Sequence, residues 1–128
     1  MQKSVLLVED EDSIAYALEF LIERAGYKLR RVSDGLAALE AIAAERPHLV
    51  LLDVMLPKRG GYEVCQEIRL NPELADVKIL MMTAKGGETE RRKGLALGAN
   101  EFVTKPFSTK DLKERIQRLL GDEADPDG

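Results

Sequence analysis

Two kinds of hydrophobic pattern alternate along the chain. Short runs of consecutive apolar residues are typical of buried strands, whereas apolar residues that recur every three or four positions are typical of helices. The runs predict strands over residues 5–8, 27–32, 48–52, 77–82 and 100–104. The run over residues 27–32 is more polar than the others, which favours a position at the edge of a sheet.

Helical spacing occupies the segments between these runs. It predicts helices over residues 12–25, 34–46, 62–70, 88–97 and 109–120. Asp12 or Ser13 is expected to cap the first helix and Ser108 the last, because their side chains can accept hydrogen bonds from free backbone N–H groups. Gly26 and Gly98 are expected to end the first and fourth helices.

Strands and helices in strict alternation indicate an α/β fold. We expect a doubly wound, flavodoxin-like domain over residues 1–120, with a five-stranded parallel sheet in the order 2-1-3-4-5 and five helices. Residues 121–128 contain four acids and no bases, so we expect a disordered acidic tail there.

Composition narrows the possible functions. The chain has 128 residues and a formal net charge of −4, and residues 1–120 are formally neutral, so no nucleic-acid surface is expected. No apolar stretch approaches the roughly 20 residues of a membrane span. The single cysteine, Cys65, suits a reducing compartment, and residues 1–4 lead into the first strand without a signal peptide. A cytoplasmic protein without membrane contact is therefore expected.

Polar side chains of complementary chemistry follow four of the predicted strands. Glu9 and Asp10 follow the first strand, and Asp53, Thr83 and Lys105 follow the third, fourth and fifth. In an open parallel sheet these positions meet at one edge, where ligands bind. Three carboxylates there repel each other, and Mg²⁺ would offset that repulsion. A carboxylate can also be a nucleophile that forms an aspartyl-phosphate, with metal and lysine neutralising the transferred group.

Five stretches in order give the chain a specific resemblance. They are residues 5–11 (VLLVEDE), 51–57 (LLDVMLP) followed by Gly61, 82–84 (MTA), 94–99 (GLALGA) and 102–107 (FVTKPF). The chain resembles the receiver domain of bacterial two-component response regulators over residues 3–120.

This resemblance implies a phosphorylation site and a metal site. Asp53 would be the phosphorylated residue. Asp10, Asp53 and the backbone carbonyl of Met55 would bind Mg²⁺ directly, and Glu9 would act through a water molecule.

The resemblance also implies how the phosphoryl group is held. Thr83, the backbone N–H of Ala84 and Lys105 would bind it, and Lys105-Pro106 would be a cis peptide. Phe102 matches the switch aromatic, which moves inward when Thr83 moves.

Partners follow from the same resemblance. A sensor histidine kinase or a phosphotransfer protein would donate the phosphoryl group from a phosphohistidine. The surface of residues 88–97, 100–104 and 109–120 would then switch and control a partner or an output domain. Glu101 and Arg115 match positions that pair across a phosphorylation-dependent homodimer. The domain would catalyse only its own phosphorylation and dephosphorylation and would not otherwise be an enzyme.

The chain departs from the family pattern near the expected site. The loop over residues 58–61 has Gly60 where many relatives have Asp or Asn. Met55 and Lys85 occupy the two positions that tune phosphate hydrolysis in the family. Because Met55 cannot orient a water molecule, we expect a phosphorylated state lasting on the order of minutes to hours.

Two other readings stay open. Asp10 and Asp12 formally fit the Asp-x-Asp motif of haloacid-dehalogenase-like phosphatases, although three residues are a weak match in so acidic a stretch. The second alternative is a receiver-like module that only binds a partner. Such a module is expected to lack Asp53, Thr83 or Lys105, and all three are present.

Overall fold

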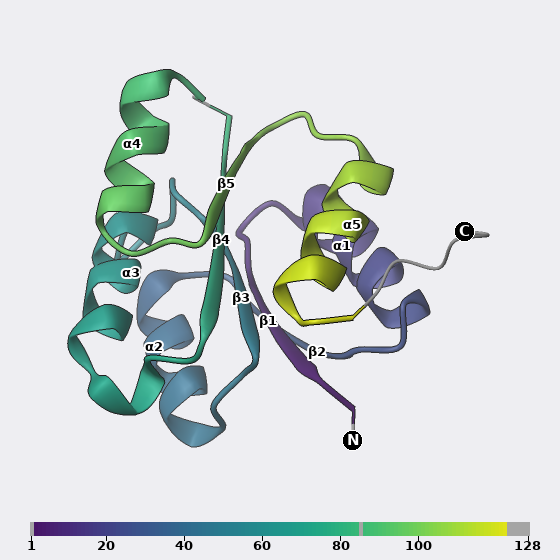
Figure 1. Cartoon of the computed structure of the whole chain (residues 1–128), viewed down its shortest axis with the longest axis horizontal. Helices are drawn as coiled ribbons and strands as arrows, with labels where there is room; N and C mark the ends of the chain where they lie inside the picture. Colours follow the sequence, from purple (N-terminus) through teal and green to yellow (C-terminus); the bar gives the residue numbers. More distant parts are fainter. Residues whose placement is uncertain (1, 85, 123–128) are drawn as a thin grey trace.

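The computed structural model describes residues 2–84 and 86–122, and these form one sheet covered by helices on both faces (Figure 1). The strands are β1 (Ser4–Val8), β2 (Lys28–Val32), β3 (Leu49–Asp53), β4 (Lys78–Thr83) and β5 (Glu101–Thr104). The helices are α1 (Asp12–Arg24), α2 (Gly35–Ala44), α3 (Gly61–Leu70), the 3₁₀ helix η1 (Pro72–Leu74), α4 (Glu88–Ala96) and α5 (Thr109–Leu119). Residues 123–128 of the expected disordered tail lie outside the described residues.

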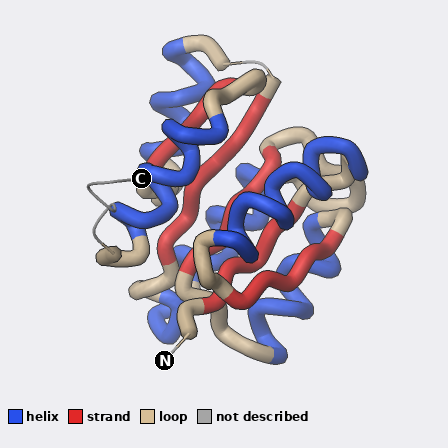
Figure 2. The backbone as a smooth tube through the Cα atoms, turned by 90° about the vertical axis from the view of Figure 1, so that its right-hand side faces the viewer, coloured by secondary structure: helices blue, strands red, loops and turns tan. Residues whose placement is uncertain are grey.

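All strand pairs are parallel, and the strand order is β2-β1-β3-β4-β5. The predicted fold class is therefore confirmed, as is the edge position of the polar strand β2. Figure 2 shows the strands running side by side between the helices. No helix in the described part of the chain is long and apolar enough to cross a membrane.

Each face of the sheet has its own apolar core. Helices α2, α3 and α4 cover one face, and α1 and α5 cover the other (Figure 1). Side chains on a strand point alternately to the two faces, so neighbours in β1 separate: Leu6 and Val8 join the first core, and Val5 and Leu7 join the second. Strands β1, β3 and β4 are buried on both faces along their central residues, which explains why those residues are apolar.

Several helix ends follow the sequence signals. Ser108 accepts a hydrogen bond from the Asp111 N–H, as predicted for a cap. Gly26 and Gly98 adopt positive φ angles of 94° and 112°, which suits glycine at the end of a helix. The η1 turn was not predicted; Asn71 accepts the Glu73 N–H at its start and Pro72 fits its first turn.

The predicted cap of α1 is wrong. The helix begins after Glu11, which makes no side-chain capping hydrogen bond. Asp12 lies in the first turn instead, and its Oδ1 lies 2.9 Å from the guanidinium of Arg31 on β2. A tertiary ion pair has thus replaced the local cap.

Candidate functional site

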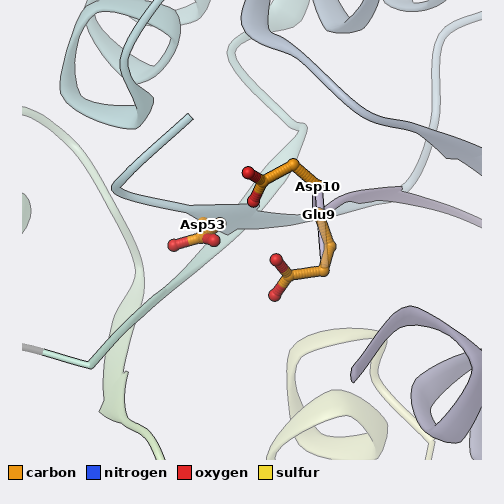
Figure 3. Close-up of side chains that lie close together, drawn as sticks. All are labelled: Glu9, Asp10 and Asp53. Atoms are coloured by element: carbon orange, nitrogen blue, oxygen red, sulfur yellow. The ribbon is translucent and has the colours of Figure 1, made fainter. Parts of the chain in front are cut away.

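Three carboxyl groups meet where β1 and β3 end (Figure 3). One carboxylate oxygen from each of Glu9, Asp10 and Asp53 lies within 4.8 Å of the other two. Glu9 is fully buried and Asp53 is 5% exposed, whereas Asp10 is exposed to solvent. We call the edge formed by the C-terminal ends of the strands the carboxyl edge of the sheet.

The loop after β5 places an ammonium group against two of these acids. The Nζ atom of Lys105 lies 2.6 Å from Oε1 of Glu9 and 3.3 Å from Oδ2 of Asp53. The Lys105 N–H donates to the carbonyl of Thr83 over 2.7 Å, and the Lys105-Pro106 peptide is cis. Burial lowers the pKa of Lys105, but the hydrogen bond to Glu9 and the charges of Asp53 and Glu9 outweigh it, so its pKa is raised.

The donor set fits a hard divalent cation. Among the residues that the structure describes, the three carboxyl groups have one ammonium, that of Lys105, paired with two of them. Carboxylate oxygens are ligands that Mg²⁺ accepts, and the exposed Asp10 keeps one side of the cluster open to a hydrated ion. The residues present therefore fit a magnesium site.

Hydrogen bonds to the backbone hold both ends of this acid cluster. Oε2 of Glu9 accepts the Glu11 N–H over 3.2 Å, and Oδ1 of Asp53 accepts the Met55 N–H over 3.2 Å. Arg31 donates to the Glu9 carbonyl from Nε over 3.1 Å and from a terminal nitrogen over 2.8 Å. The sequence analysis missed Arg31, because its only signal was a basic residue in a polar edge strand.

Of the expected phosphoryl-binding residues, Ala84 and Lys105 line an opening beside the acids, and Thr83 is buried next to Ala84. Thr83 ends β4 and is 1% exposed, and Ala84 follows it at the surface. A hollow of about 630 Å³ is bordered by both polar and apolar residues: Asp10, Glu11, Ser13, Ile14, Ala17, Leu18, Asp53, Met55, Ala84, Lys105, Pro106, Phe107 and Thr109. The acid cluster therefore opens onto a surface hollow of mixed polar and apolar lining.

The loop after β3 is fitted closely around Asp53. A Cβ atom at Gly61 would lie 2.3 Å from the Asp53 carbonyl oxygen, so only glycine fits where α3 begins. At Gly60, by contrast, a Cβ atom would meet no atom closer than 3.9 Å, so the departure from Asp or Asn is sterically open. The side chain of Met55 is 61% exposed, and Lys85 lies outside the described residues.

Phe102 already lies inward in this structure. Its side chain is 8% exposed and belongs to the core under α4. A Cβ atom at Gly94 would lie 2.9 Å from the Phe102 ring, so the glycine in α4 makes room for it. Phe102 therefore occupies an inward position in this structure, and its role as a switch stays a prediction.

The expected dimer residues pair within the chain. Arg115 lies 2.8 Å from Glu101 and 3.0 Å from Asp111, and Arg118 also approaches Glu101 at 3.7 Å. Burial lowers the pKa of Arg115, and its hydrogen bonds to Asp111 and Glu101 outweigh that effect and raise it. The structure thus brings Glu101 and Arg115 together in one molecule.

Comparisons with known proteins agree on one family. The model of the response regulator receiver domain matches residues 5–117. The alkaline phosphatase synthesis transcriptional regulatory protein of Bacillus subtilis is 43% identical over 120 residues, which cover 94% of this chain and 49% of that protein. The chain therefore spans about half the length of this curated relative.

Solved structures agree in fold. A response regulator from Chloroflexus aurantiacus is 35% identical, with a TM-score of 0.90 and coverage of 94% of this chain and 99% of that one. The receiver domain of a sensor histidine kinase from Pseudomonas aeruginosa is 30% identical, with a TM-score of 0.86 and coverage of 95% and 100%. That receiver domain was solved with a magnesium ion coordinated in its active site cleft.

Proposed function

Because this chain belongs to the response regulator receiver domain family, we propose that it accepts a phosphoryl group on Asp53 from a phosphohistidine of a sensor histidine kinase or a phosphotransfer protein. The observation that carries the proposal is the cluster at the carboxyl edge, where Asp53 lies 3.3 Å from Lys105 and within 4.8 Å of Glu9 and Asp10. A carboxylate that is paired with an ammonium and lies beside further acids is better explained by a role as phosphoryl acceptor than by a purely structural role.

In the proposed transfer, an oxygen of Asp53 attacks phosphorus. The new oxygen–phosphorus bond forms as the nitrogen–phosphorus bond of the donor breaks, and the bonding electron pair stays on the imidazole nitrogen. Asp10, Asp53 and the Met55 carbonyl would hold Mg²⁺, with Glu9 acting through water. When bound, the ion supplies positive charge that offsets the charge on the phosphoryl oxygens.

The chain's own groups then hold the product. Lys105 would move from the carboxylates of Glu9 and Asp53 toward the phosphoryl oxygens, because its short contacts to both acids keep it charged and in reach. Thr83 would donate its hydroxyl and Ala84 its N–H. No further turnover is proposed beyond phosphorylation and dephosphorylation of Asp53 itself, and Met55 gives the phosphoprotein a lifetime on the order of minutes to hours.

Output would pass through the surface of α4, β5 and α5. Thr83 and Phe102 would be the residues that respond, and both are buried beneath this surface. A phosphorylation-dependent homodimer through Glu101 and Arg115 would exchange their contact within the chain for contacts between chains. A protein that stays monomeric at high concentration with a beryllofluoride phosphoryl mimic contradicts the dimer.

Intact mass after incubation with acetyl phosphate tests the proposed function. We expect a single phosphoryl adduct that requires Mg²⁺ and is absent from Asp53→Asn. Glu73→Gln, on a remote surface turn, is the matched control and should be labelled like the wild type. Steady release of phosphate without an adduct would favour a phosphatase, and neither adduct nor release would favour a binding module.

A further inference from the structure

Arg31 links the edge strand β2 to the acid cluster. Two nitrogens of its guanidinium donate to the same acceptor, the carbonyl oxygen of Glu9. The distances are 3.1 Å from Nε and 2.8 Å from a terminal nitrogen. A second terminal nitrogen pairs with Asp12 at 2.9 Å, and the side chain is 17% exposed. The guanidinium also lies 6.0 Å from the centre of the Tyr16 ring on α1. Arg31 is thus held from three sides while it donates to a single carbonyl.

That carbonyl belongs to the peptide that joins the two acids Glu9 and Asp10. A peptide unit is planar, so fixing its oxygen fixes the last backbone dihedral angle of Glu9 and the position of the Asp10 Cα atom. The preceding peptide is fixed as well, because the Glu9 N–H donates to the Val32 carbonyl over 3.1 Å. Two successive residues of β2 therefore hold both peptides that flank Glu9.

The two acids depend on this anchor to different degrees. The buried carboxylate of Glu9 has its own partners in Lys105 at 2.6 Å and the Glu11 N–H at 3.2 Å. Asp10 is exposed, so side-chain packing constrains it little. The peptide plane before Asp10 then sets the position of its Cα atom, from which the carboxylate extends.

We propose that Arg31 is a positioning residue for the metal site, which orients Asp10 toward Asp53 by clamping the Glu9–Asp10 peptide. The proposal rests on the proposed function, because it assumes that Asp10 and Asp53 bind Mg²⁺. Arginine suits the role since its planar fork gives two parallel donors, whereas a lysine ammonium cannot reproduce that geometry.

The neighbouring Arg30 provides a matched control within the same strand. It also donates to two backbone carbonyls, those of Ala41 at 3.0 Å and Glu45 at 2.6 Å. Because strand side chains alternate, these contacts lie on the other face of the sheet, at the end of α2 and away from the acids. Arg30→Met removes the same charge and the same type of contact without touching the Glu9–Asp10 peptide.

Calorimetric titration with Mg²⁺ of the wild type, Arg31→Met, Arg31→Lys and Arg30→Met tests the proposal. Urea unfolding without Mg²⁺ first establishes that each variant is folded, and Arg31→Lys carries the test if Arg31→Met does not fold. We expect Arg31→Met to weaken Mg²⁺ binding about 10-fold, at the low end of the effects seen for outer-shell partners of metal ligands. Arg31→Lys should also weaken binding, and Arg30→Met should stay within about twofold of the wild type.

Three outcomes overturn the proposal. Unchanged affinity in Arg31→Met with reduced stability would make Arg31 a purely structural residue. Tighter Mg²⁺ binding in Arg31→Met, with Arg31→Lys unchanged, would mean that its charge matters and its geometry does not. A wild-type chain that binds no Mg²⁺ would overturn the proposed function together with this proposal, and so is distinguishable from the other two.

Discussion

The two edges of the sheet use charge in opposite ways. At the carboxyl edge, within residues 2–84 and 86–122, Glu9, Asp10 and Asp53 lie together and one ammonium, that of Lys105, pairs with Glu9 and Asp53. At the amino edge, formed by the N-terminal ends of the strands, cations pair with single acids, as Lys3 does with Asp122 and Lys28 with Glu45, both at 3.2 Å. Each edge also has a hollow, of about 630 Å³ and 600 Å³ respectively. Volume therefore does not distinguish the edges, but charge balance does.

The amino edge uses its polar groups to close the fold. Lys3 donates to the Leu120 carbonyl at the end of α5, and the Tyr27 hydroxyl donates to Asp122 over 2.6 Å. Burial and the hydrogen bond to Asp122 raise the pKa of Tyr27, and the same hydrogen bond, with help from Lys3, lowers the pKa of Asp122. These contacts tie the end of α5 to the beginnings of β1 and β2.

The contrast teaches that acids in excess of their described cations lie at the edge where the phosphoryl transfer is proposed. A polar group that has one partner of opposite charge is satisfied and contributes to the fold. Acids that outnumber their cations store repulsion, which a metal ion or a protonation event relieves. The predictions below test whether this division between the edges is real.

The largest expected effect is that of Lys105→Met. Removing the ammonium leaves Glu9 and Asp53 buried without their cation, so we expect the free energy of unfolding without Mg²⁺ to fall by about 3 kcal/mol. Mg²⁺ should then stabilise the variant more than the wild type, because no ammonium competes for the carboxylates. Urea unfolding with and without Mg²⁺ measures both effects.

The matched control for this change is Lys28→Met at the amino edge. The ion pair of Lys28 and Glu45 is about half exposed, so its loss should change the free energy of unfolding by less than about 0.5 kcal/mol, with no dependence on Mg²⁺. Equal losses at the two edges would contradict the comparison.

An intermediate effect is expected from Arg69→Ala, again at the amino edge. Arg69 donates to the carbonyls of Gly98 at 2.9 Å and Leu74 at 3.3 Å and to the Asn100 side chain at 3.0 Å. Loss of these contacts should lower the free energy of unfolding by about 2 kcal/mol. Phosphoryl uptake from acetyl phosphate should match the wild type under native conditions, and a selective loss of uptake would show that this edge takes part in the chemistry.

The smallest expected effect is that of Tyr27→Phe, about 1 kcal/mol at pH 7 because Asp122 is partly exposed. The lowered pKa of Asp122 gives stability that is present above its ordinary value and is lost as pH falls through the lower folded value. The raised pKa of Tyr27 gives stability that is lost only at strongly alkaline pH.

Urea unfolding of Tyr27→Phe and the wild type at several pH values measures this dependence. The difference in their free energies of unfolding should be constant near neutrality and should shrink in acid below about pH 4. If the difference in free energy of unfolding between Tyr27→Phe and the wild type does not change with pH, the hydrogen bond between Tyr27 and Asp122 is contradicted.

The sequence predicted the elements well where the signal was local. Gly26 and Ser108 act at helix ends as expected, and the polar strand lies at the sheet edge. The cap of α1 was wrong because Asp12 pairs with Arg31, a residue from another element. The inward position of Phe102 was also not predictable, because it depends on the space that Gly94 leaves above it.

The sequence by itself determined that the acids would gather. Parallel strands all end at the same edge, and the strand order 2-1-3-4-5 expected from the alternating pattern makes β1 and β3 neighbours, so the residues that follow them lie close together. Only the tertiary structure decided which partner each charge takes. The register of β1 and β2 sets Val8 beside Val32 and thereby brings Arg31 to the Glu9 carbonyl, and the packing of α5 sets Arg115 on Glu101. Such pairings depend on distances between elements, which no local pattern of residues encodes.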